Sequence, residues 1–375
     1  MLKGVHLTLM VGPAVPIPVP QVILDALTSV QVTTTAGKNS GFQLTFTLSN
    51  RSPLQTLFLL AGGTPIPLLR VMIIATINGT PEVLMDGFMT DHQISPGSDA
   101  GHSTLTISGE DLSVAMKYID FTGFPFPAMP AEARVALILA KYAMFGVVPL
   151  IIPSIMLDVP IPTEKIPRQE GTDFDYVKKL ADDVGYVFYI NPGPAPGMNT
   201  AYWGPTIRVG VPQPALNYDM DSFTNVEALS FNYVSDQKAL PIVWIQNEET
   251  KIPIPVPLPD VNPLSPPLGL VEPIPRKIYE IEGTAKLTPL QAILIGLAKA
   301  ADTADVVTGS GSLDVLRYGQ TLKARQLVGV RGVGMAFDGL YFVTSVTHNI
   351  KRGEYKQSFS LARNGLISTV PVVPA

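Results

Sequence analysis

The sequence predicts a mainly β protein of the α+β class, with two related small β-barrels and a helix-containing domain between them. Three observations favour this fold class. Short runs of alternating apolar and polar residues, separated by Gly, Asn, Ser and Pro turns, fill residues 22–112 and return after residue 226. Helical signals are concentrated between these two regions. Two hairpin-like segments, one in each region, are similar to each other.

The N-terminal region predicts a first β-barrel over residues 1–112. Residues 5–11, VHLTLMV, alternate with the period of a strand, and no cleavage site of a secretory signal follows them. Further strands are expected at 29–32, 42–48, 68–77 and 83–89. About 90 residues of such strands are typical of a small barrel or sandwich.

An α+β domain is expected over residues 113–225, with a helix at 131–145. Its best-defined segment is GTDFDYVKKLADDVGYVFY, residues 171–189. Thr172 is a good cap for a second helix, Asp175 can reach back to the N–H of the cap, and Gly185 suits the helix end. The β-forming residues that follow predict a strand packed against this helix. The acidic residues of the helix are expected on its solvated face.

A second β-barrel is predicted over 226–250 and 304–365, with a proline-rich arm and a helix inserted at 251–303. The inserted helix is expected at 288–303, because Thr288 is a good cap and Pro289 suits the first helical position.

The inserted arm has prolines at alternate positions: Pro253, Pro255, Pro257 and Pro259. In an extended chain this spacing removes the N–H groups along one edge, so the arm can pair only along the other edge. The segment is either a stiff polyproline-like linker or an arm that lies on a neighbouring subunit. In the second case Ile254, Val256 and Leu258 are the candidate contact residues.

The two similar segments are residues 86–111 and residues 338–365. Each begins with Asp-Gly, continues into a strand that ends in His-x-Ile, and returns through a glycine-containing turn into an alternating strand. The His-x-Ile residues are His92 and Ile94 in the first segment, and His348 and Ile350 in the second. If the segments are equivalent, the chain contains two copies of one β-domain.

The composition of the 375-residue chain narrows the class of protein. Hydrophobic residues make up 46% and charged residues only 15%, which favours an oligomer that hides apolar surface between subunits. A net charge of -5 provides no broad basic field, so nucleic-acid binding is not expected. The absence of cysteine excludes disulfides and thiolate chemistry. The apolar stretches 52–69 and 142–157 are interrupted by Gly and Pro, so no stable membrane insertion is expected.

Catalytic patterns are weak throughout the sequence, and we expect no enzyme, no cofactor and no metal. The four histidines, His6, His92, His102 and His348, lack the spacing of a metal site. Asp91 and His92 are adjacent on a strand and therefore face opposite sides. The run Gly309–Ser312 lacks the lysine of a phosphate-binding loop and is interpreted as a flexible loop.

Two stretches carry a family resemblance. The run RQEGTDFDYVKKLADDVGYVFYI, residues 168–190, resembles a segment of phage late control protein D and VgrG-type hub proteins, in which a Gln and acidic residues precede a D-F-x-(Y/F)-x-x-x-L-A helix. The run DGLYFVTSVTHNIKRGEYKQSFSLAR, residues 338–363, is similar to the closing hairpin of that family. The helix at 288–303 followed by Tyr318-Gly319-Gln320 matches its usual order.

This resemblance implies a structural baseplate hub of a contractile phage tail or a related injection system. In that family a homotrimer carries two β-barrels per subunit, so that a ring of six barrels docks on the six-fold inner tube and the other face receives a three-fold spike. The protein is then expected in the cytoplasm during assembly, as part of the particle, in contact with other baseplate proteins. VgrG proteins continue into a spike, whereas this sequence ends at Ala375, so a separate spike protein is expected.

The docking residues are not encoded by a motif of the family. The tips of the two similar hairpins, with His92, Ile94, His348 and Ile350, are the candidates for contact with the tube. The proline-rich segment 251–275 does not belong to the pattern of the family. A β-rich binding or adhesin module without catalysis is the alternative function. A tail-associated hydrolase would need a cleft with a perturbed carboxylate, which no sequence feature supplies.

Overall fold

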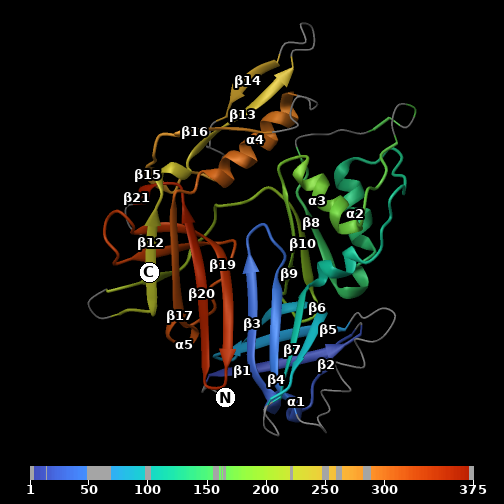
Figure 1. Cartoon of the computed structure of the whole chain (residues 1–375), viewed down its shortest axis with the longest axis vertical. Helices are drawn as coiled ribbons and strands as arrows, with labels where there is room; N and C mark the ends of the chain where they lie inside the picture. The colour runs from blue at the N-terminus through green and yellow to red at the C-terminus, as the bar shows by residue number, and fades with distance from the viewer. Residues whose placement is uncertain are drawn as a thin grey trace.

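The protein is mainly β, as predicted, and Figure 1 shows its arrangement in a computed structural model. The structure describes residues 4–13, 15–48, 69–97, 103–154, 160–161, 163, 166–219, 223–246, 253–258, 264–281 and 289–370. Several predicted features lie outside the described residues: His102, Pro259, the cap Thr288 and nearly all of the apolar stretch 52–69.

The first β-module is an antiparallel sheet with the strand order β3-β4-β7-β6-β5-β1-β2. Its predicted strands all form, since alternating apolar residues from each strand enter one core. Its elements are β1 (Val5–Gly12), β2 (Ile17–Pro18), α1 (Gln21–Ala26), β3 (Leu27–Thr35), β4 (Gly41–Leu48), β5 (Arg70–Ile77), β6 (Thr80–Ser95) and β7 (Ser103–Asp111).

The second β-module repeats this strand order. Its strands β12-β17-β20-β19-β18 follow one another in space as β3-β4-β7-β6-β5 do, and in both modules all neighbours in this set are antiparallel. The elements are β12 (Ala228–Tyr233), β17 (Val307–Asp314), α5 (Val315–Tyr318), β18 (Leu327–Arg331), β19 (Gly339–Lys351), β20 (Glu354–Arg363) and β21 (Leu366–Ser368). The chain therefore contains two copies of one β topology.

The two modules are joined edge to edge. Strand β19 pairs with β3 from Ser345–Thr35 to Lys351–Ser29, which makes one sheet continuous through both modules. One apolar core also spans the junction, with Leu44 and Ile107 from the first module and Val346 and Phe359 from the second. Figure 1 shows the blue strands β3 and β4 beside the red strands β19 and β20. The sequence did not predict this shared sheet.

The middle domain packs helices on one face of a small sheet with the order β8-β10-β9. Its elements are the 3₁₀ helices Leu112–Lys117 and Ala143–Phe145, α2 (Ala131–Ala140), β8 (Val147–Ile151), α3 (Asp173–Asp182), β9 (Val187–Pro192), β10 (Asn199–Gly204) and β11 (Gln213–Asn217). Strand β11 lies in the sequence range predicted for this domain, yet it pairs with β18 of the second module.

Helix α3 has the predicted cap and the predicted end, but the Asp175 carboxylate accepts from the Thr172 hydroxyl at 2.7 Å and not from the N–H that the sequence predicted. The Thr172 Oγ1 accepts a hydrogen bond from the Asp175 N–H at 3.2 Å, and Gly185 adopts the left-handed conformation after the last turn. The prediction for Asp173 is wrong. This carboxylate is fully buried and accepts hydrogen bonds from Lys141, Tyr142 and Gln169, so it holds the domain together instead of facing water.

The inserted arm is a small sheet, β14-β13-β16, covered by α4. Its elements are a 3₁₀ turn (Ser235–Gln237), β13 (Ala239–Gln246), β14 (Pro253–Pro257), β16 (Lys277–Glu280) and α4 (Pro289–Thr303). The strand β15 (Gly269–Val271) lies in the same stretch of sequence but pairs with β21 of the second module. Strand β14 pairs only with β13 in the described residues, as the proline spacing predicts. Because β13 belongs to this sheet, strand pairing places the start of the arm before residue 251.

Candidate functional site

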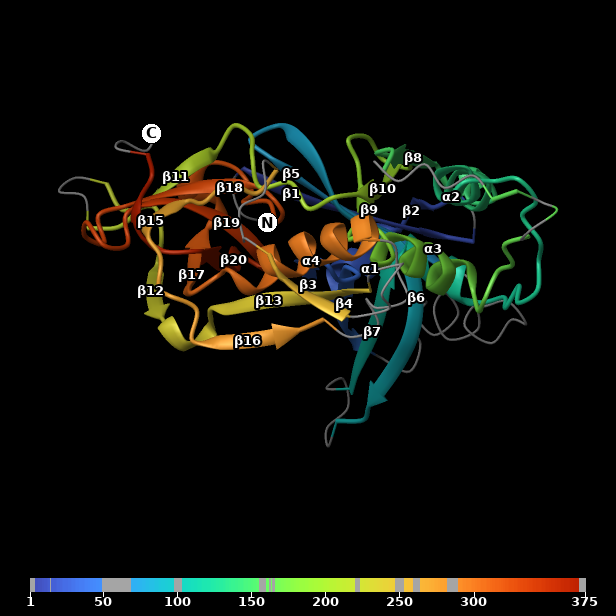
Figure 2. The same cartoon turned by 90° about the horizontal axis from the view of Figure 1, so that it is seen from above.

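The first predicted docking residues, His92 and Ile94, lie on an exposed part of the β6–β7 hairpin. Figure 2 shows this hairpin projecting away from the rest of the molecule. His92 is exposed and the Ile94 side chain is 43% exposed. The fold therefore leaves both side chains accessible to a partner.

The second pair of predicted docking residues is buried, so the prediction that they contact the tube is wrong. His348 is 8% exposed and Ile350 is 7% exposed, both on the core side of β19. The His348 Nδ1 lies 2.8 Å from the hydroxyl oxygen of Tyr355. Burial lowers the pKa of His348 to about 4.

A shared β-bulge shows which residues of the two hairpins are equivalent. The register of β6 and β7 shifts between Met89 and Asp91, and that of β19 and β20 shifts between Val343 and Ser345. The hydroxyl of Thr90 donates to the Ser108 carbonyl at 3.3 Å, and that of Thr344 donates to the Ser360 carbonyl at 3.1 Å. Aligning the bulges pairs His92 with Val346, so the His-x-Ile similarity in the sequence is out of register by two residues.

The three candidate contact residues of the arm have different environments. Ile254 is 48% exposed and remains a candidate for contact with a neighbouring subunit. Val256 is partly buried against the small core of the arm. Leu258 is 4% exposed and packs against Gly296 of α4, so its assignment to a subunit contact is wrong.

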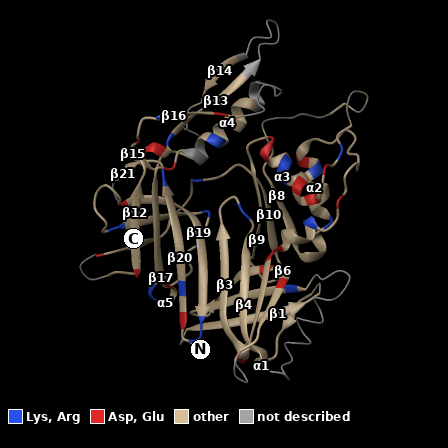
Figure 3. Ribbon diagram, viewed as in Figure 1, with Lys and Arg blue, Asp and Glu red and all other residues tan. Residues whose placement is uncertain are grey.

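The outer face of the continuous sheet is rich in hydroxyl and amide side chains. One row across the strands contains Ser230, Ser310, Ser360, Ser345 and Thr35, from β12, β17, β20, β19 and β3. Neighbouring rows add Ser312, Ser358, Thr347, Thr33, Asn349, Gln31, Gln43, Thr45 and Thr106. Figure 3 shows few charged residues along these strands. We call this surface the hydroxyl face.

Hydrogen bonds within the hydroxyl face cross the junction of the modules. The Thr33 and Thr347 hydroxyls lie 3.1 Å apart, and those of Thr35 and Ser345 lie 3.2 Å apart. The prediction of a flexible loop at Gly309–Ser312 is wrong, because these residues lie in the middle of β17. The alternation of Ser with Gly in that run was a strand signal, with Gly309 and Gly311 against the rings of Phe231 and Phe359.

Two arginines fix the modules to the middle domain. Arg70 forms a buried ion pair with Asp86 at 2.7 Å and donates to the Phe145 carbonyl, while Asn199 donates to the same carboxylate. Arg325 donates to the carbonyls of Thr35 and Lys38 at the β3–β4 turn and to the side chain of Asn191 in β9. These positions could not be assigned from sequence, because each arginine acts across elements distant in the chain.

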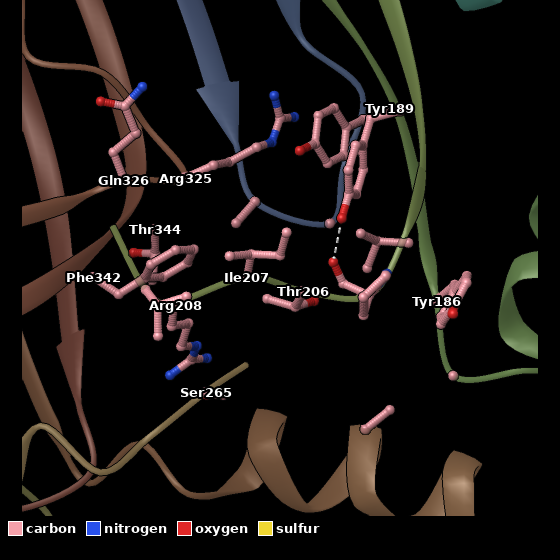
Figure 4. Close-up of a pocket in the computed structure, with 18 of the residues that line it drawn as sticks. Tyr186, Tyr189, Thr206, Ile207, Arg208, Ser265, Arg325, Gln326, Phe342 and Thr344 are labelled. Carbon is pink, nitrogen blue, oxygen red and sulfur yellow. Dashed lines mark hydrogen bonds between the residues drawn. The ribbon is translucent and has the colours of Figure 1, made fainter. Parts of the chain in front are cut away.

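A cavity of about 750 Å³ lies where the middle domain, the second module and α4 meet. Figure 4 shows its walls, with Tyr186 and Tyr189 on one side and Arg208 and Phe342 on the other. The ring of Tyr189 stacks on Tyr202 with 4.9 Å between centroids, and the Arg325 guanidinium lies 3.9 Å from the Tyr189 centroid. Burial raises the pKa of both tyrosines. The cavity is therefore aromatic with cationic groups in its walls.

Charge in the cavity walls is mostly positive. Arg208 forms an ion pair with Asp305 at 2.7 Å and lies 4.9 Å from the Phe342 centroid. Lys299 and Asp182 also line the cavity, and burial raises the pKa of Asp182. Among the residues that the structure describes, no three His, Asp or Glu side chains gather in a way that could hold a metal ion.

Solved structures of tail proteins superpose on nearly the whole chain. The tail protein from Neisseria meningitidis MC58 aligns over 97% of this chain and 98% of its own, with a TM-score of 0.61 and 14% identity. The 43 kDa tail protein of prophage MuSo2 from Shewanella oneidensis aligns over 96% and 98%, with a TM-score of 0.58 and 15% identity. The chain has the fold of a phage tail protein. This finding confirms, at the level of fold, the resemblance in the sequence.

The tail-protein fold also occurs in a longer protein. In the Francisella PdpA-VgrG complex, a chain matches all of this sequence with a TM-score of 0.61 and 10% identity, and the match covers 55% of that chain. No protein-family model and no curated protein matches the sequence itself. Within the described residues of this tail-protein fold, no helix is long and apolar enough to span a membrane.

Proposed function

We propose that this protein is the structural baseplate hub of a contractile phage tail or a phage-tail-like injection system, and that it acts as a homotrimer without catalysis. Three chains with two equivalent modules each would present six similar units to a six-fold inner tube. Their other ends would present a three-fold platform to a separate spike protein. The repeated strand order of the two modules is the observation that carries this proposal.

The edge-to-edge joining of the modules supports this role. Because β3 and β19 share one ladder and one core, the two modules of a chain keep a fixed relation. A hub that transmits load between tube and spike needs modules that do not slide past each other. The exposed β6–β7 hairpin, with His92 and Ile94, is the proposed contact with the tube, and Ile254 of the arm is the proposed contact between subunits.

The hydroxyl face is the proposed lining of the central passage. Its Ser, Thr, Asn and Gln side chains are polar and uncharged, and Lys356 in one of its rows forms ion pairs with Glu227 and Glu354, so a moving polymer would meet neither apolar patches nor strong fields. A net charge of -5 gives no general attraction for nucleic acid. The proposed setting is a particle assembled in the cytoplasm with the inner tube and other baseplate proteins, without stable insertion in a membrane.

Light scattering after size-exclusion chromatography tests the proposal. The expected result is one species with three times the 40.2 kDa mass of the chain, and six similar lobes in one projection of electron micrographs. Added tube protein should bind the trimer, and should bind much more weakly to a variant in which the exposed side chains of the hairpin are replaced, His92→Ser with Ile94→Ser. A stable monomer at micromolar concentration that does not bind the tube protein would contradict the hub function and favour a free-standing binding module.

A further inference from the structure

The cavity between the middle domain, the second module and α4 has an exposed apolar rim. Residues 205–212 connect β10 to β11 outside any strand, and Ile207, Val209 and Val211 are exposed while Arg208 between them is buried. This alternation is typical of an extended chain. The Arg208 N–H donates to the Leu264 carbonyl, which fixes the middle of the segment. An extended chain segment with exposed apolar side chains therefore borders the cavity.

Two arginines in the walls of the cavity, Arg208 and Arg325, each have a buried nitrogen atom without a hydrogen-bond partner. In both arginines this atom is the Nε. Arg325 donates to the neutral oxygens of Thr35, Lys38 and Asn191, and within the part of the chain that the structure describes it forms no direct ion pair, although the charge of buried Asp111 attracts it from a distance. Burial lowers the pKa of Arg325, because its charge is poorly solvated. A carboxylate placed in the cavity would offset this cost.

We propose that the cavity binds an extended peptide segment of a partner protein, apolar with one acidic residue. The backbone of the peptide would run along residues 207–211, its apolar side chains would contact Val209 and the tyrosines, and its carboxylate would lie near the arginines. This proposal rests on the hub function in one respect: a hub contacts other proteins of the particle, and one of them would supply the peptide segment.

The observations favour a peptide over a small anion. A volume of about 750 Å³ exceeds what a single anion needs and falls in the usual range for ligand pockets, about 300–1,000 Å³. The apolar rim adds contacts that a small anion would not use. Extended peptides commonly bind beside exposed extended segments, where main-chain hydrogen bonds give affinity and alternate side chains give specificity.

An array of eight-residue peptides, varied systematically in apolar, acidic and basic content, tests the site with the purified full chain. The strongest peptide and its Asp→Asn counterpart are then titrated by fluorescence anisotropy. The expected result is saturable binding to acidic apolar peptides, with affinity lowered about tenfold by the Asp→Asn change. Absence of saturable binding, preference for basic peptides, or full competition by millimolar succinate would overturn the proposal.

Two exposed substitutions locate the binding on the chain. Val209→Ser removes an apolar contact at the rim and should weaken binding about tenfold, and Lys299→Gln should weaken it less. Val148→Ser, the same change at an exposed valine on β8 outside the cavity, should leave affinity unchanged. If the Val209→Ser variant binds the peptide as tightly as the parent protein does, the proposed location of the site is wrong. Light scattering on the same samples reports the trimer separately, so failure of the hub and failure of the peptide site give different results.

Discussion

Arg70 and Asp86 form an ion pair whose side chains are 4% and 0% exposed, at the contact between the first module and the middle domain. Asp86 also accepts from Asn199, and Arg70 also donates to the Phe145 carbonyl. A buried charge that loses its partner is far more costly than an exposed one, because water cannot replace the interaction. These two side chains therefore hold the domain contact at the residue scale.

The variant Asp86→Ala should lower the free energy of unfolding by about 3–5 kcal/mol, because it leaves the Arg70 guanidinium buried without its carboxylate. Urea unfolding at neutral pH measures the change. The double variant Arg70→Met, Asp86→Leu should lose less, since both charges are removed. Glu170→Ala breaks the exposed ion pair with Lys179 and serves as a control with an expected loss of about 0–1 kcal/mol. Equal losses in Asp86→Ala and the double variant would contradict this explanation.

His348 should make the stability of the protein depend on pH. Burial lowers its pKa in the folded chain to about 4, from an ordinary value of 6.5. Below pH 6.5 the unfolded chain binds a proton that the folded chain does not, so stability is fully present above this pH and falls as the pH decreases toward 4. Between pH 7 and pH 5 the loss from this residue should be about 2 kcal/mol.

The variant His348→Gln tests this pH dependence. A glutamine has no charge to gain and can still form a hydrogen bond with the Tyr355 hydroxyl, so the difference in unfolding free energy between pH 7 and pH 5 should shrink. Urea titrations at both values measure it. His92→Gln, at an exposed position, should keep the pH dependence of the parent protein. The same difference in His348→Gln as in the parent would show that other groups cause the effect.

At the scale of elements, the arm sheet packs closely against α4 at Gly296, where there is no side chain to separate them. A Cβ at Gly296 would lie 1.9 Å from Leu258 Cδ1 and 2.9 Å from Val243 Cγ1. Leu258, Val243, Ile281 and Ala292 form a small core between α4 and the strands β13 and β14. This small core fixes the arm sheet to α4.

The variant Gly296→Ala should destabilise the arm by about 1–3 kcal/mol, because the added methyl group overlaps with Leu258. In a Leu258→Ala background the same change should cost much less, since the space for the methyl group is then open. A double-mutant cycle from thermal unfolding measures the coupling. Additive effects of the two substitutions would mean that the helix and the strand do not contact each other in solution.

At the scale of the whole molecule, the repeated module explains how one chain presents a large polar surface. Strands β12, β17, β20 and β19 of the second module continue into β3, β4, β7 and β6 of the first. The opposite face of this sheet is apolar and buried in the shared core. Because polar and apolar side chains alternate along each strand, the sheet has a polar outer face that extends across both modules.

The absence of cysteine allows a direct test of the proposed passage. In Ser310→Cys the thiol lies on the hydroxyl face, and in Met144→Cys it lies on an exposed part of the middle domain. In the assembled trimer both should react with N-ethylmaleimide, while a maleimide on a large polyethylene glycol should modify only Met144→Cys. Mass spectrometry of the products measures both reactions. Rapid modification of Ser310→Cys by the large reagent would place the hydroxyl face outside the passage.

Features that depend on neighbours a few residues apart could be predicted from the sequence. The alternation in β1 and β4, the Thr172 cap, the Gly185 helix end and the proline-blocked edge of β14 all follow from local backbone chemistry, and the structure confirms them. The similarity of the two hairpins was visible in the sequence, although its register was wrong by two residues, since His-x-Ile gave no indication of the bulge at Thr344.

How these elements meet could not be predicted, because it depends on contacts between distant segments of the chain. The pairing of β3 with β19 joins residues such as Thr35 and Ser345, 310 positions apart, and no local pattern selects that partner. The same pairing buries His348 and Ile350, which an alternating strand could equally have turned outward. The cavity depends on Arg208 and Arg325 from separate segments. Strand alternation fixes which residues share a face, whereas the packing of distant segments decides which face is covered.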